Sequence, residues 1–172
     1  MQNPKKFQKA LEIDAAFTGK MALDFAFLVA AQAEEVYKDK GLCFPVTVSS
    51  TLLYLTRVKV ASLLEISSAL NHQHQLVAQR IKILLKLELI EANSDPMDKR
   101  RTLYRLSKTG KRQGELLQDY CNEAAQVFID LSNEVGVNLL DSLHQASTAL
   151  QRTPLSERFV ALNERQTKGE DA

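Results

Sequence analysis

Amide and cationic side chains suited to contacting an extended anionic partner gather between residues 72 and 112. This segment contains ten basic and four acidic residues, whereas residues 113–172 contain four basic and ten acidic ones. The formal net charge of the 172-residue chain is only +1, so the asymmetry is local. A basic segment set in an otherwise neutral or acidic protein is typical of a surface that binds nucleic acid.

Two kinds of contact with duplex DNA can be assigned to side chains of this segment. Glutamine can bond adenine through two hydrogen bonds, and arginine can bond guanine in the same way. Lysine and arginine also neutralise phosphates. We therefore expect base contacts from Gln73, His74, Gln79 and Arg80. We expect phosphate contacts from Lys82, Lys99, Arg100 and Arg101.

The elements that must position these side chains are two short helices joined by a tight turn. Ser62 and Glu65 have the spacing of a capping box, which predicts the start of the first helix. Asn71 tolerates the left-handed backbone that a tight turn needs. Apolar residues at helical spacing mark the second helix: Leu76, Val77, Ile81, Leu84 and Leu85. Two such helices form a helix-turn-helix, whose second helix can enter the major groove.

A short β-hairpin is expected directly after the second helix. Residues 89–92 and 102–106 alternate partly, as half-buried strands do, and a basic tip lies between them. Residues 58–61 are short and β-prone, and are expected to add a third strand. The tip could be an ordinary solvated loop, but its three consecutive basic residues favour a wing that grips phosphate. The predicted fold class is α+β, mainly α, with a small β-hairpin wing on a winged helix-turn-helix core.

Two motifs in and after the wing match a known pattern. They are Asp95-Pro96-Met97-Asp98-Lys99-Arg100 and Leu106-Ser107-Lys108-Thr109-Gly110. They resemble the signature of the MarR family of dimeric bacterial regulators, and the similarity runs without a gap over residues 47–110. Three residues depart from the family pattern. Met97 stands where the wing often has Arg, Gln73 where a capping Ser is common, and Asn71 where the turn often has Gly.

The resemblance implies a homodimeric, sequence-specific transcriptional regulator that binds a pseudo-palindromic operator in double-stranded DNA. It also implies a small-molecule or oxidant signal, received in a cleft between dimerisation helices and the DNA-binding lobe. The candidate ligand-binding residues are Phe25, Cys43, Phe44 and Tyr54. Cys43 has neither a helix N-terminus nor a cationic neighbour that would activate its thiol, so a small buried core residue is expected there.

Helices at both ends of the chain are expected to bracket the core and pair two subunits. The apolar stripe within residues 5–44 is broader than packing against one small domain requires, although burial in its own subunit is the alternative. Further amphipathic helices are expected over residues 111–165. We therefore predict a single MarR-like domain over residues 1–172, with a DNA-binding lobe at residues 45–110 and dimerisation helices at residues 5–44 and 111–165.

Enzyme chemistry, metal binding and membrane insertion are not expected. No nucleophile–base pair, paired carboxylates or glycine-rich phosphate loop stands out. His72 and His74 are two residues apart, face different directions on a helix and lack a Cys or carboxylate cluster, so no metal or cofactor is expected. Two cysteines do not suggest a disulfide framework. Without a bilayer-spanning apolar run or a signal-peptide core, the protein is expected in the cytoplasm.

A second function remains open on the sequence, namely a winged-helix protein-interaction module that has lost DNA binding. Met97, Gln73 and the low net charge favour it. The basic residues 72–112 argue against it, because such a module has no reason to keep this excess. DNA binding requires the cations of the second helix and the wing to line one face, whereas intervening acidic side chains would favour the module.

Overall fold

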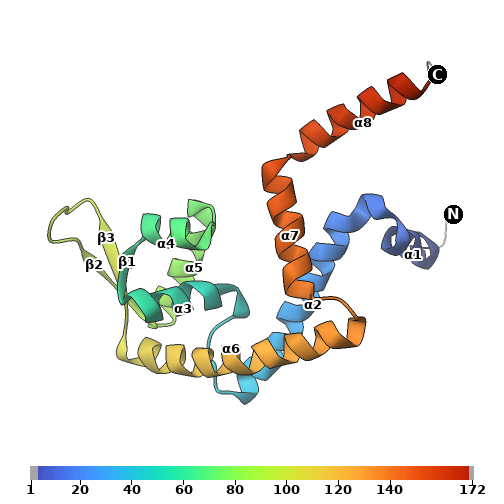
Figure 1. The fold of residues 1–172 in the computed structure, drawn as a ribbon. Coiled ribbons are helices and arrows are strands. Elements are labelled where there is room, and N and C mark those ends of the chain that lie inside the picture. The colour runs from blue at the N-terminus through green and yellow to red at the C-terminus, as the bar shows by residue number, and fades with distance from the viewer. Residues whose placement is uncertain (1–3, 171–172) are drawn as a thin grey trace. The chain divides into compact units, whose positions relative to one another are not determined.

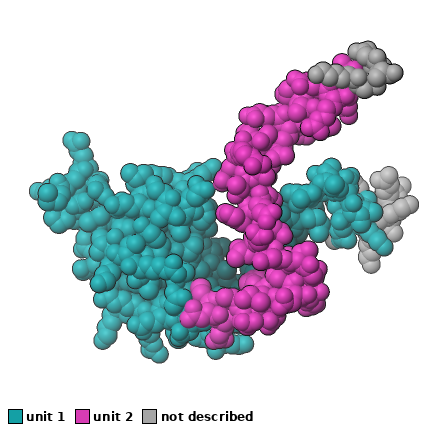
Figure 2. Space-filling view, in the orientation of Figure 1, with its two compact units in different colours: residues 1–120 teal, residues 121–172 magenta. Residues whose placement is uncertain are grey.

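The computed structural model describes residues 4–170, in which helices are interrupted by one small sheet (Figure 1). The elements fall into two compact units, residues 1–120 and residues 121–172 (Figure 2). Mainly helical structure with a small antiparallel sheet confirms the predicted α+β fold class. No helix in the described part of the chain is both long and apolar enough to cross a membrane.

The elements before the helix-turn-helix are α1 (Pro4–Ile13), the 3-10 helix η1 (Ala15–Phe17), α2 (Thr18–Asp39), the 3-10 helix η2 (Val46–Val48) and α3 (Ser49–Val58). The winged core continues with β1 (Val60–Ser62), α4 (Leu63–Leu70), α5 (His74–Lys86), β2 (Ile90–Ser94) and β3 (Thr102–Leu106). The remaining helices are α6 (Lys108–Val135), α7 (Leu139–Arg152) and α8 (Leu155–Glu170).

Helices α4 and α5 form the predicted helix-turn-helix. The capping box is confirmed, because the Ser62 backbone N–H donates to Glu65 Oε2 at 2.7 Å and the Glu65 N–H donates back to Ser62 Oγ. Asn71 has φ 50° and ψ 44°, the left-handed conformation expected of the turn. Val77 and Leu84 of α5 are fully buried, so one face of this helix anchors it to the core.

The sheet has the strand order β1-β3-β2, and both pairings are antiparallel. Val60 pairs with Arg105, and Ile90 pairs with Leu106. The third strand predicted from the sequence is confirmed, although it begins two residues later than expected. Helix α3 runs to Val58, so the strand can form only after the chain has turned at Lys59.

The base of the hairpin is closed by the Ser107-x-x-Gly110 segment. Ser107 Oγ accepts from the Gly110 N–H at 2.9 Å, and it donates to the Glu88 carbonyl at 2.7 Å. The Ser107 N–H donates to the Leu89 carbonyl at 3.0 Å. A Cβ atom on Gly110 would lie only 1.8 Å from that carbonyl oxygen. Glycine is therefore needed here for the close approach of α6 to the chain leaving α5.

The core of the first unit is built from α3, the helix-turn-helix, the sheet and the start of α6. Its fully buried apolar side chains are Val48, Leu52, Leu55, Ile66, Val77, Leu84, Leu89 and Leu117. Tyr37 extends this core toward the N-terminal helices through edge-to-face contacts with Phe44 and Tyr120, whose ring centroids lie 5.6 Å and 4.8 Å away.

The apolar stripe of α2 is largely exposed rather than buried in its own subunit. Phe25 is 38% exposed, and Phe27 is 64% exposed. Helix α7 has no buried residue, and Phe159 of α8 is 62% exposed. This distribution leaves apolar surface at both ends of the chain for a second subunit, and the dimer interface itself stays a prediction.

Replacing Gly110 with alanine should lower the free energy of unfolding by about 3 kcal/mol, because the new methyl group meets a backbone carbonyl at the hairpin base. Urea unfolding measures this change. Gly19→Ala is the matched control, since a methyl group at this position would meet nothing within 4 Å. It should stabilise α2 by up to about 1 kcal/mol. Unchanged stability of Gly110→Ala would mean that α6 can shift away from Leu89.

Candidate nucleic-acid interface

Helix α5 presents a polar face to solvent. Gln73 is its N-cap residue and makes no side-chain capping hydrogen bond, and His74 begins the first turn. Both side chains are exposed, as are those of Gln79 and Lys82. Since residues three and four apart share a helix face, Gln79 and Lys82 project from α5 together.

One residue of this face was not predicted from the sequence. Gln75 is exposed and lies four residues before Gln79, so the two amides are neighbours on α5. Its spacing from Gln79 was the available signal. We therefore add Gln75 to the residues that can reach a partner lying along this helix.

Arg80 has a different setting from its neighbours on α5, because it is half-buried. Its Nη1 lies 2.8 Å from His72 Nδ1 and donates to Ser50 Oγ at 3.3 Å. Its Nε is buried with no hydrogen-bond partner in the described structure. The guanidinium thus ties α5 to the preceding turn and to the start of α3, which leaves fewer donors for a base edge.

Burial also sets the protonation of this pair. It lowers the pKa of His72, and the adjacent Arg80 charge lowers it further. Burial likewise lowers the pKa of Arg80, which remains charged near neutral pH. A neutral His72 can accept from Arg80 at Nδ1, whereas a protonated one cannot. The contact therefore depends on His72 staying neutral.

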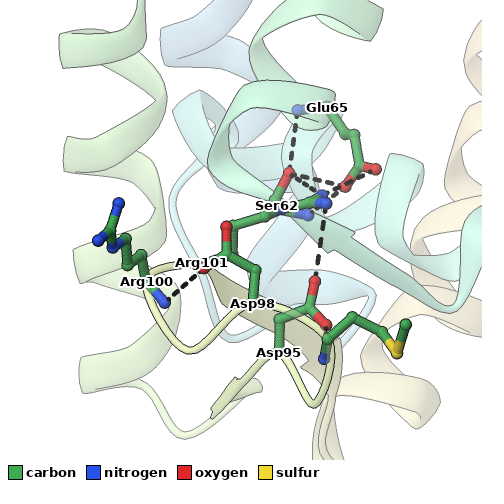
Figure 3. A network of polar contacts seen from close by, with 7 residues as sticks. Ser62, Glu65, Asp95, Asp98, Arg100 and Arg101 are labelled. Carbon is green, nitrogen blue, oxygen red and sulfur yellow. Dashed lines mark hydrogen bonds and ion pairs between the residues drawn. The ribbon is translucent and has the colours of Figure 1, made fainter.

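The wing is fastened to α4 through Arg101 (Figure 3). The Arg101 Nη2 donates to Glu65 Oε1 at 3.2 Å and to Ser62 Oγ at 3.3 Å, and its Nη1 lies 3.6 Å from Asp95 Oδ2. The hydrogen bonds from Ser62 and the charge of Arg101 lower the pKa of Glu65. One guanidinium thus joins both ends of the wing tip to the capping box of the helix-turn-helix.

The two aspartates of the wing shape its tip. Asp95 is only 8% exposed, and its Oδ1 accepts from the Met97 N–H at 2.9 Å. Asp98 Oδ1 accepts from the Arg100 N–H at 3.0 Å. The Arg100 side chain points away from the Arg101 cluster, and Lys99 is also exposed (Figure 3). The tip therefore presents these two cations on an ordered turn, with Met97 94% exposed beside them.

The cations expected at the interface thus fall into two groups. Lys82, Lys99 and Arg100 are exposed and make no side-chain ion pair within residues 4–170. Arg80 and Arg101 contact other protein groups, and acidic side chains stand beside Arg101. The first group has its charge available for an external anion, whereas the second group holds α5 and the wing in place.

The four candidate ligand-binding residues lie in unlike surroundings. Phe25 is partly exposed on α2, Phe44 is 4% exposed, and Tyr54 is half-buried on α3. Cys43 is exposed, so the expectation of a buried core thiol was wrong. These residues lie in the loop between α2 and η2, where Leu42 and Phe44 are buried in the core and Cys43 between them is exposed.

The described residues contain no group of three or more His, Cys, Asp or Glu side chains that could hold a metal ion. His72 instead contacts Arg80, as described above, and His74 is exposed.

No family model matches the sequence, and a search of curated proteins finds no match. Solved structures do match. The crystal structure of the S. aureus MepR–DNA complex matches 80% of this chain and 99% of that chain, at 20% identity and a TM-score of 0.62. The adhesin competence repressor AdcR from Streptococcus pyogenes matches 78% of this chain and 96% of that chain, at 18% identity and a TM-score of 0.57.

The chain has a winged-helix fold. At identities of this size the likeness establishes the fold, and a partner has to be argued from this chain's own residues. In the winged helix, α4 and α5 are the helix-turn-helix, and β2 and β3 with the tip between them are the wing.

The Arg101 contacts predict that Arg101→Leu loosens the wing, because Asp95 and Glu65 lose their shared cation. The free energy of unfolding should fall by about 1 kcal/mol, the range of a partly exposed ion pair. Hydrogen exchange of the Asp95 amide, which donates to the Arg101 carbonyl at 2.9 Å, should accelerate. Arg100→Leu is the matched control, and its amide exchange should match that of the parent. Identical exchange in the two variants would refute the clamp.

The His72–Arg80 contact predicts a loss of stability in acid. The pKa of His72 is lower in the folded protein than its ordinary value of 6.5, so its stabilisation is complete above pH 6.5 and declines as the pH falls below it. Free energies of unfolding measured on both sides of pH 6.5 test this. His72→Gln should flatten the dependence, and His74→Gln should leave it in place. A decline that survives in His72→Gln would assign it to another group.

Proposed function

We propose that this chain is a sequence-specific transcriptional regulator of the MarR type, which binds double-stranded DNA as a homodimer in the cytoplasm. The observation that carries the proposal is the division among the polar side chains of α5 and the wing. Those that pair within the protein brace α5 and the wing, and those that remain exposed lie on these same two elements. Such an arrangement offers donors to a partner that contacts both elements at once.

Helix α5 is the element we assign to the major groove. Its exposed amides on Gln75 and Gln79 suit adenine, and His74 lies at the end of the helix that enters a groove first in helix-turn-helix proteins. Arg80 could still use its remaining donors on guanine or phosphate. We assign it first the task of holding α5 at a fixed angle, because its Nη1 is occupied by His72 and Ser50.

The wing and Lys82 supply the phosphate contacts in this proposal. Lys99 and Arg100 project from the tip, and the aspartate-capped turn fixes the backbone that carries them. Arg101 contributes by anchoring the wing rather than by a free charge. One of the matching structures is a complex with DNA, which supports the same kind of partner for this winged helix.

The exposed apolar stripes on α2, α7 and α8 support a homodimer. Pairing these helices would present two α5 helices to a pseudo-palindromic operator, at a spacing of about 34 Å, one turn of DNA. A small-molecule or oxidant signal would then act by favouring one spacing of the two lobes over another. Phe25, Cys43, Phe44 and Tyr54 remain the proposed contacts for that signal.

The alternative of a protein-interaction module has two observations in its favour. The carboxylates of Glu65 and Asp95 lie beside Arg101 and offset its charge. Met97 is 94% exposed at the wing tip, where an apolar side chain could contact another protein. The exposed cations Lys99 and Arg100 near it favour DNA, because a protein contact would have to remove them from water.

The proposal predicts a steep dependence of DNA affinity on salt. Three phosphate contacts from each protomer, by Lys82, Lys99 and Arg100, correspond to a slope of log affinity against log salt of roughly −5. Fluorescence anisotropy on duplexes that the protein selects from a random-sequence pool measures it. Lys99→Gln/Arg100→Gln should reduce the slope by about 3 to 4, because two contacts per protomer are lost.

The charge-matched control for this experiment is Lys9→Gln/Lys38→Gln, which removes exposed cations outside α5 and the wing. Its slope should equal that of the parent protein. A flat salt response of the parent, or failure to select any sequence, would contradict the proposed function and leave the protein-interaction module as its replacement.

A further inference from the structure

A groove lies at the base of the wing, inside the first unit. It encloses about 710 Å³, a volume typical of sites for small organic molecules. Its walls come from the end of α3, the strands of the sheet and the first turns of α6. None of the four candidate ligand-binding residues lines it.

Charged side chains around this groove carry an unbalanced positive charge. Six of them line it: Lys59, Glu91, Arg105, Lys108, Lys111 and Glu115. Arg105 and Glu91 neutralise each other across β3 and β2, where Nη2 and Oε2 lie 2.8 Å apart. Three lysines then face a single remaining carboxylate, and none of the three makes an ion pair within the described residues. The lining of the groove therefore carries a net formal charge of about +2.

The positions of Lys108 and Lys111 are unfavourable in the absence of an anion. Lys108 and Lys111 occupy the first turn of α6, where the partial positive charge of the helix end repels them. Lys59 has φ 69° and ψ −42°, a backbone conformation that a side-chain-bearing residue rarely adopts. Residues that go against the usual preferences for helix-end charge and backbone conformation are expected together where a site binds a ligand.

The floor of the groove is apolar. Leu55 is fully buried beneath it, Leu106 is 8% exposed, and Val60 is 47% exposed at its edge. Val60 and Arg105 are register partners of β1 and β3, so the apolar floor and a cation stand side by side. A ligand that satisfied both would combine an apolar body with concentrated negative charge.

We propose that this groove is a binding site for a small organic dianion, an apolar body that carries a phosphate monoester or an equivalent pair of negative charges. The anionic group contacts Lys108 and Lys111 at the start of α6, with Lys59 facing it from the end of α3. The apolar body lies on Val60 and Leu106. This inference stands independently of the proposed DNA binding, because it rests on a groove outside the exposed face of α5 and the wing tip.

The consequence for the wing follows from the lining residues. A ligand in the groove contacts residues at the roots of β1 and β3 and at the start of α6, all of which join the wing to the rest of the first unit. Occupancy would relieve the repulsion at the start of α6 and stabilise that junction.

Phenyl phosphate is a suitable probe, because it joins one apolar ring to a phosphate monoester. Isothermal titration of the full chain should give saturable binding of phenyl phosphate, and weaker binding of inorganic phosphate and of phenol, each of which lacks one part of the ligand. Lys108→Gln/Lys111→Gln should weaken phenyl phosphate by about tenfold or more, since two charge-assisted contacts are lost. Both lysines are exposed and lie at the helix end that repels cations, so the thermal unfolding midpoint of the variant should equal or slightly exceed that of the parent.

The matched control is Lys99→Gln/Arg100→Gln, which removes the same charge from the wing tip of the same lobe. It should bind phenyl phosphate within about twofold of the parent. If both variants lost the same affinity for phenyl phosphate, the binding would reflect general attraction to a basic lobe, and the proposed site would be overturned. No saturable heat with phenyl phosphate would overturn it as well. If Lys108→Gln/Lys111→Gln lost affinity for duplex DNA but not for phenyl phosphate, these lysines would be DNA contacts and the proposed site would be overturned.

Discussion

The approach of α6 to the end of α5 is the constraint on which the wing depends. Leu89 follows the end of α5, Ser107 directly precedes α6, and Gly110 lies in the first turn of α6. The whole hairpin lies between Leu89 and Ser107. The Ser107 N–H bonds the Leu89 carbonyl, and the missing Cβ of Gly110 lets the helix come against the same group. With its two ends fixed in this way, the hairpin can leave the core at only a narrow range of angles.

Arg101 adds the second attachment, at the far side of the hairpin. It reaches the capping box of α4, so the same carboxylate that starts the first helix of the helix-turn-helix also receives the wing. Arg80 holds α5 in place in the same way, through its contacts with His72 and Ser50. Arginine suits both places because its planar group can donate to several acceptors at once. Because Arg80 and Arg101 hold α5 and the wing in place, the exposed cations are available to contact a partner.

Local chemistry made much of this fold predictable from the sequence. The capping box, the left-handed Asn71 and the β-prone residues 58–61 each depend on near neighbours, and the corresponding elements are present. The contacts of Arg80 and Arg101 could not be predicted from near neighbours, because their partners lie up to 39 residues away in the sequence. Cys43 was misjudged for a related reason. Its exposure depends on which side chains of the loop between α2 and η2 face the core, and the burial of Leu42 and Phe44 decides that.

The capped tip of the wing also bears on entropy. Asp95 and Asp98 fix the backbone before and across the exposed cations through hydrogen bonds that exist before any partner arrives. An unstructured loop would have to surrender its backbone freedom on contact, at roughly 1–2 kcal/mol for every residue that becomes ordered. Here that ordering is done during folding, and only the torsions of two long side chains remain to be restricted on contact. Small changes at these aspartates would therefore alter affinity without touching any group that meets the partner.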